Sequence, residues 1–350
     1  MPLRSPALRT LALAMMACAG WTASAHADTL SVVTFGGAYE AAVKPAYFEP
    51  FTAQTQHDFT YQSYSGGLAK LQAMVQAKNV TWDIVDLEAN DAMRACEEGL
   101  LERFDKKLLG STEDFLPGTI SDCAVASMVW SSVYAYDSSK ITGTPSSIQD
   151  FFDIEKFPGK RGMRKSAKGA LEWALMADGV PKEDVYSTLA TKSGVERAFK
   201  KLDTIKSNIV WWDSGAQAPQ LLADGAVAMV AAYNGRISDA VKKDGKPFTI
   251  VWDAQLYDIE WWGVPKGAKN AKVASEFIAF ASQPQRYADL SKYIPYAPPR
   301  KKALELIDAE RLNDLPTAPA NFKNALQMDA EFWADKGDTL SKQFQNWLTR

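Results

Sequence analysis

Short β-rich runs alternate with helical stretches through the first part of the chain. Residues 30–35, 57–64 and 82–87 are β-rich, and helical stretches follow them at 41–51, from Leu68 and at 89–99. In the second of these stretches, apolar side chains recur at spacings of three and four residues, which places them on one helix face. Pro45 interrupts the first. This β-α-β-α order predicts a parallel sheet flanked by helices.

A second series of the same kind begins with a long β-like run at 125–136. Further strands are expected at 159–164, 209–212, 226–233, 249–252 and 260–264, with helices at 169–176, 194–205 and 219–223. From 271 onward the chain is mostly helical, apart from a proline-rich break at 295–299. Because no long polar linker separates the two series, we expect two lobes joined by strand crossovers.

The N-terminus has the features of a secretory signal peptide. Arg4 and Arg9 precede a short apolar run at 11–17, and Ala25-His26-Ala27 forms a small-residue cleavage site. The apolar run is too short to span a bilayer, which takes about 20 residues. We therefore expect cleavage after Ala27 and a periplasmic location. A lipoprotein anchored at Cys18 is the alternative.

Charge and cysteine content narrow the class of protein further. Removing residues 1–27 takes away two arginines and no acids, so the net charge moves from −3 to about −5. A mildly acidic exported chain argues against nucleic-acid binding, which favours a basic face. Cys96 and Cys123 remain, and in an oxidising compartment they are expected to form a disulfide, with two buried free thiols as the alternative.

The sequence lacks the residues that several kinds of catalytic and metal-binding site require. After the predicted cleavage His57 is the one remaining histidine, which leaves no basis for a Ser-His-Asp or Cys-His mechanism. The zinc motifs H-E-x-x-H and C-x-x-C are absent, as are the glycine-rich nucleotide-binding motifs. The sequence thus predicts no enzyme, no metal site and no cofactor.

Aromatic and charged residues instead gather where the predicted strands end. Open α/β sheets bind ligands outside the carboxyl ends of their strands. Those ends fall at 35–39, 64–67, 88–91, 211–214, 233–236 and 258–262. Aromatic faces with carboxylates suit an organic ammonium, and an arginine suits a carboxylate.

Several segments, in their order along the chain, resemble the polyamine-type (spermidine/putrescine) periplasmic binding proteins. They are Phe35-Gly36-Gly37-Ala38-Tyr39, Trp82-Asp83-Ile84-Val85, Asp150-Phe151-Phe152 with Phe157-Pro158-Gly159-Lys160, Tyr233-Asn234-Gly235, Trp261-Trp262-Gly263-Val264-Pro265, and Tyr293-Ile294-Pro295-Tyr296. The resemblance covers essentially the whole mature chain. It implies a type II periplasmic-binding-protein fold, an α/β architecture of two lobes that each have a mostly parallel sheet flanked by helices. The expected lobes are 28–135 with 264–305, and 136–263, and the C-terminal helices of 306–350 pack on them.

In such a fold the ligand lies between the lobes. The resemblance implies that Phe35, Tyr39 and Tyr233 form aromatic walls around the ligand. It also implies that Glu260 binds a ligand ammonium group. Together with the strand ends, the expected ligand-binding residues are Phe35, Gly36, Gly37, Tyr39, Glu88, Asn90, Trp212, Ser214, Tyr233, Arg236, Glu260, Trp261 and Tyr296.

The chain also departs from the polyamine pattern. Gly36-Gly37 stands where an acidic residue is expected, and Arg164-Lys165-Ser166-Ala167-Lys168 stands where further acids are expected. A pocket with Glu88 and Glu260 at one pole and Arg236 with Lys165 at the other suits a zwitterion better than a diamine. Arg236 in a salt bridge away from any ligand is the alternative.

The resulting hypothesis is a monomeric solute-binding component of an ABC importer, which captures a small amine and delivers it to a permease in the inner membrane. A polyamine is the first expectation and an amino acid such as γ-aminobutyrate the second. The rival hypotheses are a ferric-ion carrier, a chemoreceptor-coupled sensor, and a secreted enzyme that uses Glu88 and Glu260 as acid and base.

Overall fold

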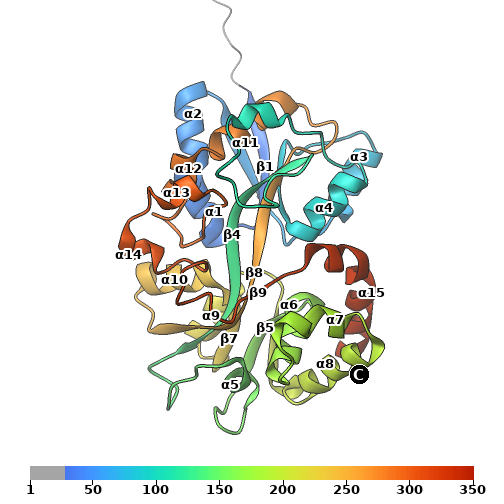
Figure 1. Cartoon of the computed structure of the whole chain (residues 1–350), viewed down its shortest axis with the longest axis vertical. Helices are drawn as coiled ribbons and strands as arrows, with labels where there is room; N and C mark the ends of the chain where they lie inside the picture. The colour runs from blue at the N-terminus through green and yellow to red at the C-terminus, as the bar shows by residue number, and fades with distance from the viewer. Residues whose placement is uncertain (1–27) are drawn as a thin grey trace, which may run out of the picture.

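Two lobes joined by two long strands make up the molecule. The computed structural model describes residues 28–350, and the strands that run between the lobes are β4 (Ala124–Asp137) and β8 (Phe248–Gly263) (Figure 1). The predicted signal peptide, residues 1–27, lies outside the described residues. The two-lobed α/β fold and its strand crossovers are thus confirmed.

One mixed sheet runs through both lobes in the order β2-β1-β3-β8-β4-β7-β5-β6, and β9 pairs with β8. The shorter strands are β1 (Thr29–Thr34), β2 (Asp58–Ser63), β3 (Ile84–Glu88), β5 (Arg161–Arg164), β6 (Ile209–Trp212), β7 (Met229–Tyr233) and β9 (Leu326–Gln327). β1 runs parallel to β2 and β3, and β5 runs parallel to β6 and β7. β8 is antiparallel to β3 and to β4. The carboxyl ends of the parallel strands in each lobe therefore lie near the crossovers, between the lobes.

The sequence pattern was wrong in dividing 249–264 into two strands, because β8 is continuous. The polar residues Asp253, Gln255 and Asp258 interrupt the apolar pattern, but their side chains have partners inside the protein. The Gln255 amide, for example, donates to the carbonyl oxygens of Pro316 and Asn321 at 3.0 and 2.6 Å. Buried polar groups that are satisfied in this way do not end a strand.

Helices cover both faces of the sheet in the first lobe, at the top of Figure 1. They are α1 (Gly37–Val43), α2 (Glu49–Thr55), α3 (Ala69–Gln76), α4 (Ala89–Glu97), α11 (Ala271–Ala281), α12 (Pro284–Leu290) and α13 (Lys301–Leu304). The expected break at Pro45 is a π-helical turn, Lys44–Phe48, between α1 and α2. Proline removes a backbone donor, so a local change of helix type is its usual consequence.

The second lobe and the C-terminal segment supply the other helices. They are α5 (Ile148–Phe152), α6 (Ala167–Ala177), α7 (Val185–Leu189), α8 (Lys192–Asp203), α9 (Gln217–Ala223), α10 (Asn234–Asp244), α14 (Ala309–Leu312) and α15 (Ala330–Leu348). The sequence pattern did not predict α5, α7 or α10. α15 contacts both lobes: its Trp333 indole donates to Glu172 of α6 at 2.7 Å, and its Asp338 accepts from Arg94 of α4 at 3.3 Å.

The predicted disulfide is present. Cys96 and Cys123 are bonded, with their Cα atoms 5.6 Å apart. The bond ties the end of α4 to the residue that precedes β4, one of the two crossovers. By the chain-entropy model, closing a loop of this length stabilises the fold by about 3–4 kcal/mol.

Candidate ligand-binding site between the lobes

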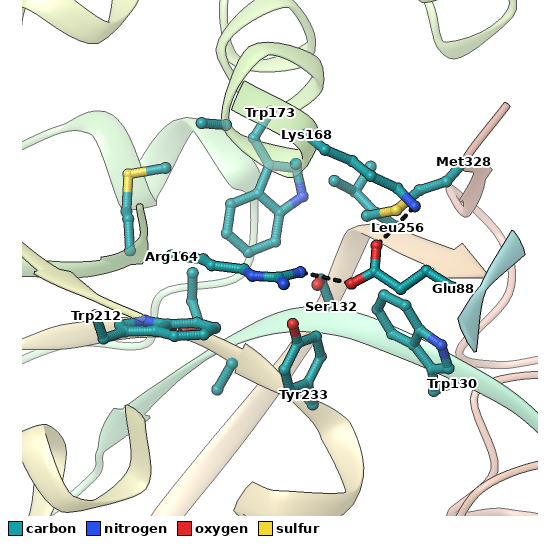
Figure 2. A pocket seen from close by; sticks show the side chains of 15 residues that line it. Glu88, Trp130, Ser132, Arg164, Lys168, Trp173, Trp212, Tyr233, Leu256 and Met328 are labelled. Carbon is teal, nitrogen blue, oxygen red and sulfur yellow. Dashed lines mark hydrogen bonds and ion pairs between the residues drawn. The ribbon is translucent and has the colours of Figure 1, made fainter. Parts of the chain in front are cut away.

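Two adjoining cavities lie between the lobes at the ends of the parallel strands. We call the first the Arg236 cavity; it is lined by Phe35, Tyr39, Glu88, Met128, Trp130, Tyr233, Arg236, Glu260 and Tyr296. We call the second the Lys168 cavity; its lining includes Glu88, Trp130, Ser132, Arg164, Lys168, Trp173, Trp212 and Tyr233 (Figure 2). Glu88, Trp130 and Tyr233 line both cavities, so the two are direct neighbours, and we refer to them together as the cleft.

Strand ends and the crossovers position these side chains. Glu88, Arg164 and Tyr233 are the last residues of β3, β5 and β7, which is where an open α/β sheet presents its ligand. Trp130 and Glu260 come from the crossover strands β4 and β8. Because side chains alternate along a strand, Met128, Trp130 and Ser132 of β4 all face the cleft.

In the Lys168 cavity every charged group has a partner. Glu88 accepts from Arg164 at 2.7 Å and from Lys168 at 3.0 Å, and Figure 2 shows both cations converging on its carboxylate. The Lys168 ammonium also reaches Asp258 at 2.7 Å and the Asn90 side-chain oxygen at 2.7 Å. Burial opposes ionisation of Glu88, but Lys168 and Arg164 together hold its pKa well below the ordinary value.

In the Arg236 cavity two opposite charges lack partners. Arg236 and Glu260 are 4% and 3% exposed. Arg236 donates through Nη2 to the Phe35 carbonyl oxygen at 2.9 Å, while its Nε and Nη1, and Oε1 of Glu260, contact no hydrogen-bond partner among the residues that the structure describes. Buried charged groups without partners are strongly unfavourable, so their presence in a cavity indicates a site for a charged ligand.

The protonation of Glu260 reflects its surroundings. Burial, followed by the nearby carboxylates of Asp86, Glu88 and Asp258, raises the pKa of Glu260 well above its ordinary value. A cation bound beside Glu260 would favour the ionised form and reverse that effect.

Aromatic rings line the same cleft. Trp130 and Tyr233 pack edge to face with their centroids 5.0 Å apart, and Tyr39 and Tyr296 lie 6.2 Å apart. Phe35 packs against Tyr64 at 5.0 Å. Rings of this kind exclude water and can contact an alkyl chain or an ammonium group.

Glycines leave the space that Arg236 occupies. A Cβ atom at Gly37 would lie 2.5 Å from Arg236 Nη1, and one at Gly215 would lie 2.8 Å from Nε. Gly37 also has a φ of 60°, which other residues rarely adopt. The Gly36-Gly37 turn therefore admits a guanidinium group from the opposite lobe.

Of the expected site residues, the structure places eight in the lining of the cleft. They are Phe35, Tyr39, Glu88, Trp212, Tyr233, Arg236, Glu260 and Tyr296. Gly36 and Gly37 adjoin the cleft as the turn that leads into α1, and Asn90 reaches it through Lys168.

Two of the expected site residues, Trp261 and Ser214, lie outside the lining of the cleft. A third expected residue, Lys165, is not among its cations. Trp261 lines a separate cavity beside Cys96, because it faces away from Glu260 on β8. The Ser214 backbone N–H donates to the Gln217 side chain at 2.9 Å, and neither cavity includes Ser214 in its lining. Lys165 is exposed, so the cations from this segment are Arg164 and Lys168 instead.

The sequence reasoning missed Trp130, Met128, Arg164 and Lys168 as site residues. The alternation along the long strand could have indicated Met128 and Trp130 once one face was assigned to the cleft. No signal in the sequence indicates that Arg164 and Lys168 meet Glu88, which lies 76 and 80 positions earlier in the chain.

Comparison with known proteins identifies the family. Residues 46–321 match the model for bacterial extracellular solute-binding proteins. The chain belongs to this family. A γ-aminobutyric acid-binding protein from Pseudomonas aeruginosa is 50% identical over 328 residues, which cover 94% of this chain and 93% of that protein. The chain is thus a solute-binding component of an ABC transporter.

Solved structures give the same picture. The GABA receptor Atu4243 is 34% identical, with a TM-score of 0.80 over 92% of this chain and 98% of that one. The binding protein AgtB from Agrobacterium tumefaciens R10, in complex with agropinic acid, is 31% identical, with a TM-score of 0.84 over 92% and 99% of the two chains.

These relatives change the expected ligand class. PotD, a spermidine/putrescine-binding protein from Streptococcus pneumoniae, is 17% identical, with a TM-score of 0.69 over 92% of this chain and 100% of that one, a level that shows the fold alone. The resemblance to solute-binding proteins is confirmed, but the polyamine type is not. The amino-acid alternative is better supported than the polyamine expectation.

The family assignment also bears on location and activity. Its members are extracellular solute-binding proteins, so the protein acts outside the cytoplasm in a binding role. Between residues 28 and 350, no helix is long and apolar enough to cross a membrane.

Proposed function

We propose that the protein binds γ-aminobutyrate, or a closely similar amino acid whose ammonium and carboxylate are separated by a short alkyl chain. The single observation that carries this proposal is the presence of two oppositely charged, buried and unpaired groups, Arg236 and Glu260, in one cavity. A zwitterion supplies one partner for each. The ligand carboxylate accepts hydrogen bonds from the Arg236 guanidinium group, and the ligand ammonium donates to Oε1 of Glu260.

The charge balance of the cleft argues against a diamine. Glu88 and Asp258 are already neutralised by Arg164 and Lys168, which leaves Glu260 as the available anion. A diamine brings two positive charges to a cleft that already holds three cations. Its second ammonium would lose its hydration without gaining an anion, and like charges in a buried site disfavour binding.

The walls of the Arg236 cavity suit the middle of such a ligand. Tyr39, Trp130, Tyr233 and Tyr296 surround the space between the two charges with aromatic surface. A short methylene chain gains from the burial of its apolar surface there. The two GABA-binding relatives, at 50% and 34% identity, support the same ligand class.

Contacts across the cleft indicate how binding is linked to transport. Arg164, Lys168 and Arg236 of the second lobe bond to Glu88, Ser65 and Phe35 of the first lobe. These contacts form only when the lobes are together. We infer that the ligand favours this closed form because it supplies hydrogen-bond partners to Arg236 and Glu260. The closed form, as a monomer, then docks on the permease.

The test is a calorimetric titration of protein that has been unfolded and refolded to remove bound ligand. We expect γ-aminobutyrate to bind, and butylamine and butyrate, which each lack one of its charges, to bind about 100-fold more weakly or worse. Putrescine is the fourth ligand of the set. Binding of putrescine as tight as that of γ-aminobutyrate would contradict the proposal.

A further inference from the structure

The Lys168 ammonium occupies a three-oxygen site at the end of the cleft. Its Nζ lies 3.0 Å from Glu88 Oε2, 2.7 Å from Asn90 Oδ1 and 2.7 Å from Asp258 Oδ2. An ammonium has three N–H donors, so these oxygens satisfy it completely. We call these three acceptors the ammonium cage. The Lys168 side chain is 10% exposed, so the cage is nearly dry.

Local structure directs Lys168 into this cage. Lys168 and Gly169 leave the helical conformation inside α6, with a φ of 91° at Gly169, a value that favours glycine. The buried carboxylate of Glu172 fixes the turn by accepting from the Gly169 N–H at 2.8 Å, and the Trp333 indole of α15 donates to the same carboxylate at 2.7 Å. The lysine is therefore held in place by the fold and not by the ion pairs alone.

The cage adjoins the space that we assign to the ligand. Asp258 and Glu260 stand two residues apart on β8, so they share one face and their Cα atoms are about 7 Å apart. Asp258 belongs to the cage, whereas Glu260 faces the Arg236 cavity. A four-carbon diamine has its two ammonium groups at a similar separation, so Glu260 and the cage could hold both ends of such a ligand.

We propose that Lys168 is a built-in ammonium that fills a second ammonium site of the cleft and so restricts the protein to ligands with one ammonium group. This proposal rests on the proposed function, because it explains why a cleft rich in carboxylates accepts a zwitterion and rejects diamines. Lys168 is the specificity-determining residue, and the cage that it fills is a latent site for an alkylammonium group.

The experiment removes the internal ammonium and asks whether an external one replaces it. In the Lys168→Ala variant, stripped of ligand, we expect putrescine to bind at least about tenfold more tightly than it binds to the wild-type protein. Methylammonium, which is small enough to enter the cage, should raise the melting temperature of Lys168→Ala relative to sodium chloride at the same ionic strength. It should not raise that of the wild-type protein.

The matched control is Lys168→Met, which removes the charge but keeps a side chain of similar length in the cage. If the cage must be vacant, Lys168→Met gains much less putrescine affinity than Lys168→Ala. Equal gains in the two variants would mean that charge alone excludes diamines, and would overturn the proposal. So would a putrescine affinity of Lys168→Ala within about threefold of the wild-type value.

A second variant covers the case in which Lys168→Ala does not fold because Asp258 is left without a partner. Lys168→Ala combined with Asp258→Asn removes that unpaired carboxylate and keeps Glu88 and Asn90 in the cage. The same stabilisation by methylammonium is expected, and its absence would overturn the proposal. The methylammonium measurement does not depend on γ-aminobutyrate, so failure of wild-type protein to bind γ-aminobutyrate would contradict the proposed function while leaving the cage to be judged separately.

Discussion

Two buried arginines of the second lobe, Arg161 and Arg236, differ in how completely their guanidinium groups are bonded. Arg161 is fully buried and donates to four carbonyl oxygens at 2.7–3.1 Å; the acceptors are Phe151, Asp153, Phe157 and Gly159. Arg236 is 4% exposed and donates to one carbonyl oxygen, that of Phe35. The guanidinium group of Arg161 is fully bonded, whereas Nε and Nη1 of Arg236 have no hydrogen-bond partner among the residues that the structure describes.

Under the proposed function, this difference separates a structural cation, Arg161, from a ligand-binding cation, Arg236. The acceptors of Arg161 all come from one segment of the chain, so this arginine holds together the turn that leads from α5 into β5. The surroundings of Arg236 come from both lobes, and the glycines at 37 and 215 leave room around its guanidinium group. A buried guanidinium group without all of its hydrogen bonds lowers the stability of the ligand-free protein, and the same group is then available to bind a ligand.

Replacement of Arg161 by methionine should have the largest effect, and it should fall on stability. Four carbonyl oxygens lose their shared donor, so we expect the free energy of unfolding to fall by about 3–5 kcal/mol. The melting temperature should fall by roughly 5–10 °C. Differential scanning calorimetry measures this change, and the dissociation constant for γ-aminobutyrate should stay within about twofold. An unchanged melting temperature would show that Arg161 is not structural.

Replacement of Arg236 by methionine should have the reverse pattern. The affinity for γ-aminobutyrate should fall by about 100-fold, or about 2.7 kcal/mol, because the ligand carboxylate loses its cationic partner. The melting temperature of the ligand-free protein should stay the same or rise. Lys165→Gln, which removes an exposed cation nearby, is the control and should change neither quantity. If the variant were less stable but bound γ-aminobutyrate as tightly as the wild-type protein, Arg236 would be a structural residue like Arg161.

Replacement of Glu260 by glutamine should stabilise the empty protein. The raised pKa of Glu260 means that the folded protein holds this proton more tightly than the unfolded chain does. Stability is therefore lost as the pH rises from the ordinary carboxyl range toward the raised pKa. Glutamine removes that loss, so we expect a gain of about 1–2 kcal/mol at neutral pH together with loss of the response to γ-aminobutyrate. Thermal melts between about pH 5 and pH 8 should show the difference between variant and wild type growing with pH.

The last of these predictions concerns the pH dependence of binding. Because Glu260 must be ionised to accept the ligand ammonium, affinity for γ-aminobutyrate should rise with pH, by up to about tenfold per pH unit below the raised pKa. Titrations at several pH values measure the slope. Any binding that survives in Glu260→Gln should be nearly independent of pH, and a flat wild-type profile would contradict a role for Glu260.

Much of the fold could be predicted because its strands have simple patterns. β7 is a continuous apolar run, as expected for a strand covered on both faces, and β4 is long enough to connect two lobes. α10 was missed because it begins with Asn234-Gly235, which is typical of a turn, and it is stabilised by packing against β4 and β8. The local pattern of hydrophobic and polar residues does not indicate tertiary packing of this kind, so the helix could not be predicted from it.

The site could be predicted only in part, because a single sequence does not indicate which residues of the two lobes contact each other across the cleft. Arg236 follows from the rule that ligands bind at strand ends, and Glu260 was expected from the family resemblance. Glu88 follows from the same rule, but its neutralisation by Arg164 and Lys168 depends on how two lobes close. The choice of Lys168 over Lys165 depends on a backbone turn at Gly169, where a φ of 91° redirects the chain.

The most direct test of the assignment of the two charges is a thermodynamic cycle that combines two ligands with one substitution. Calorimetry would measure γ-aminobutyrate and butylamine, which lacks the carboxylate, on wild-type protein and on Arg236→Met. If Arg236 binds the ligand carboxylate, the substitution weakens γ-aminobutyrate by about 100-fold and leaves butylamine within about threefold. An equal loss for both ligands would contradict the assignment, because it would mean that Arg236 supports the cleft without contacting the carboxylate.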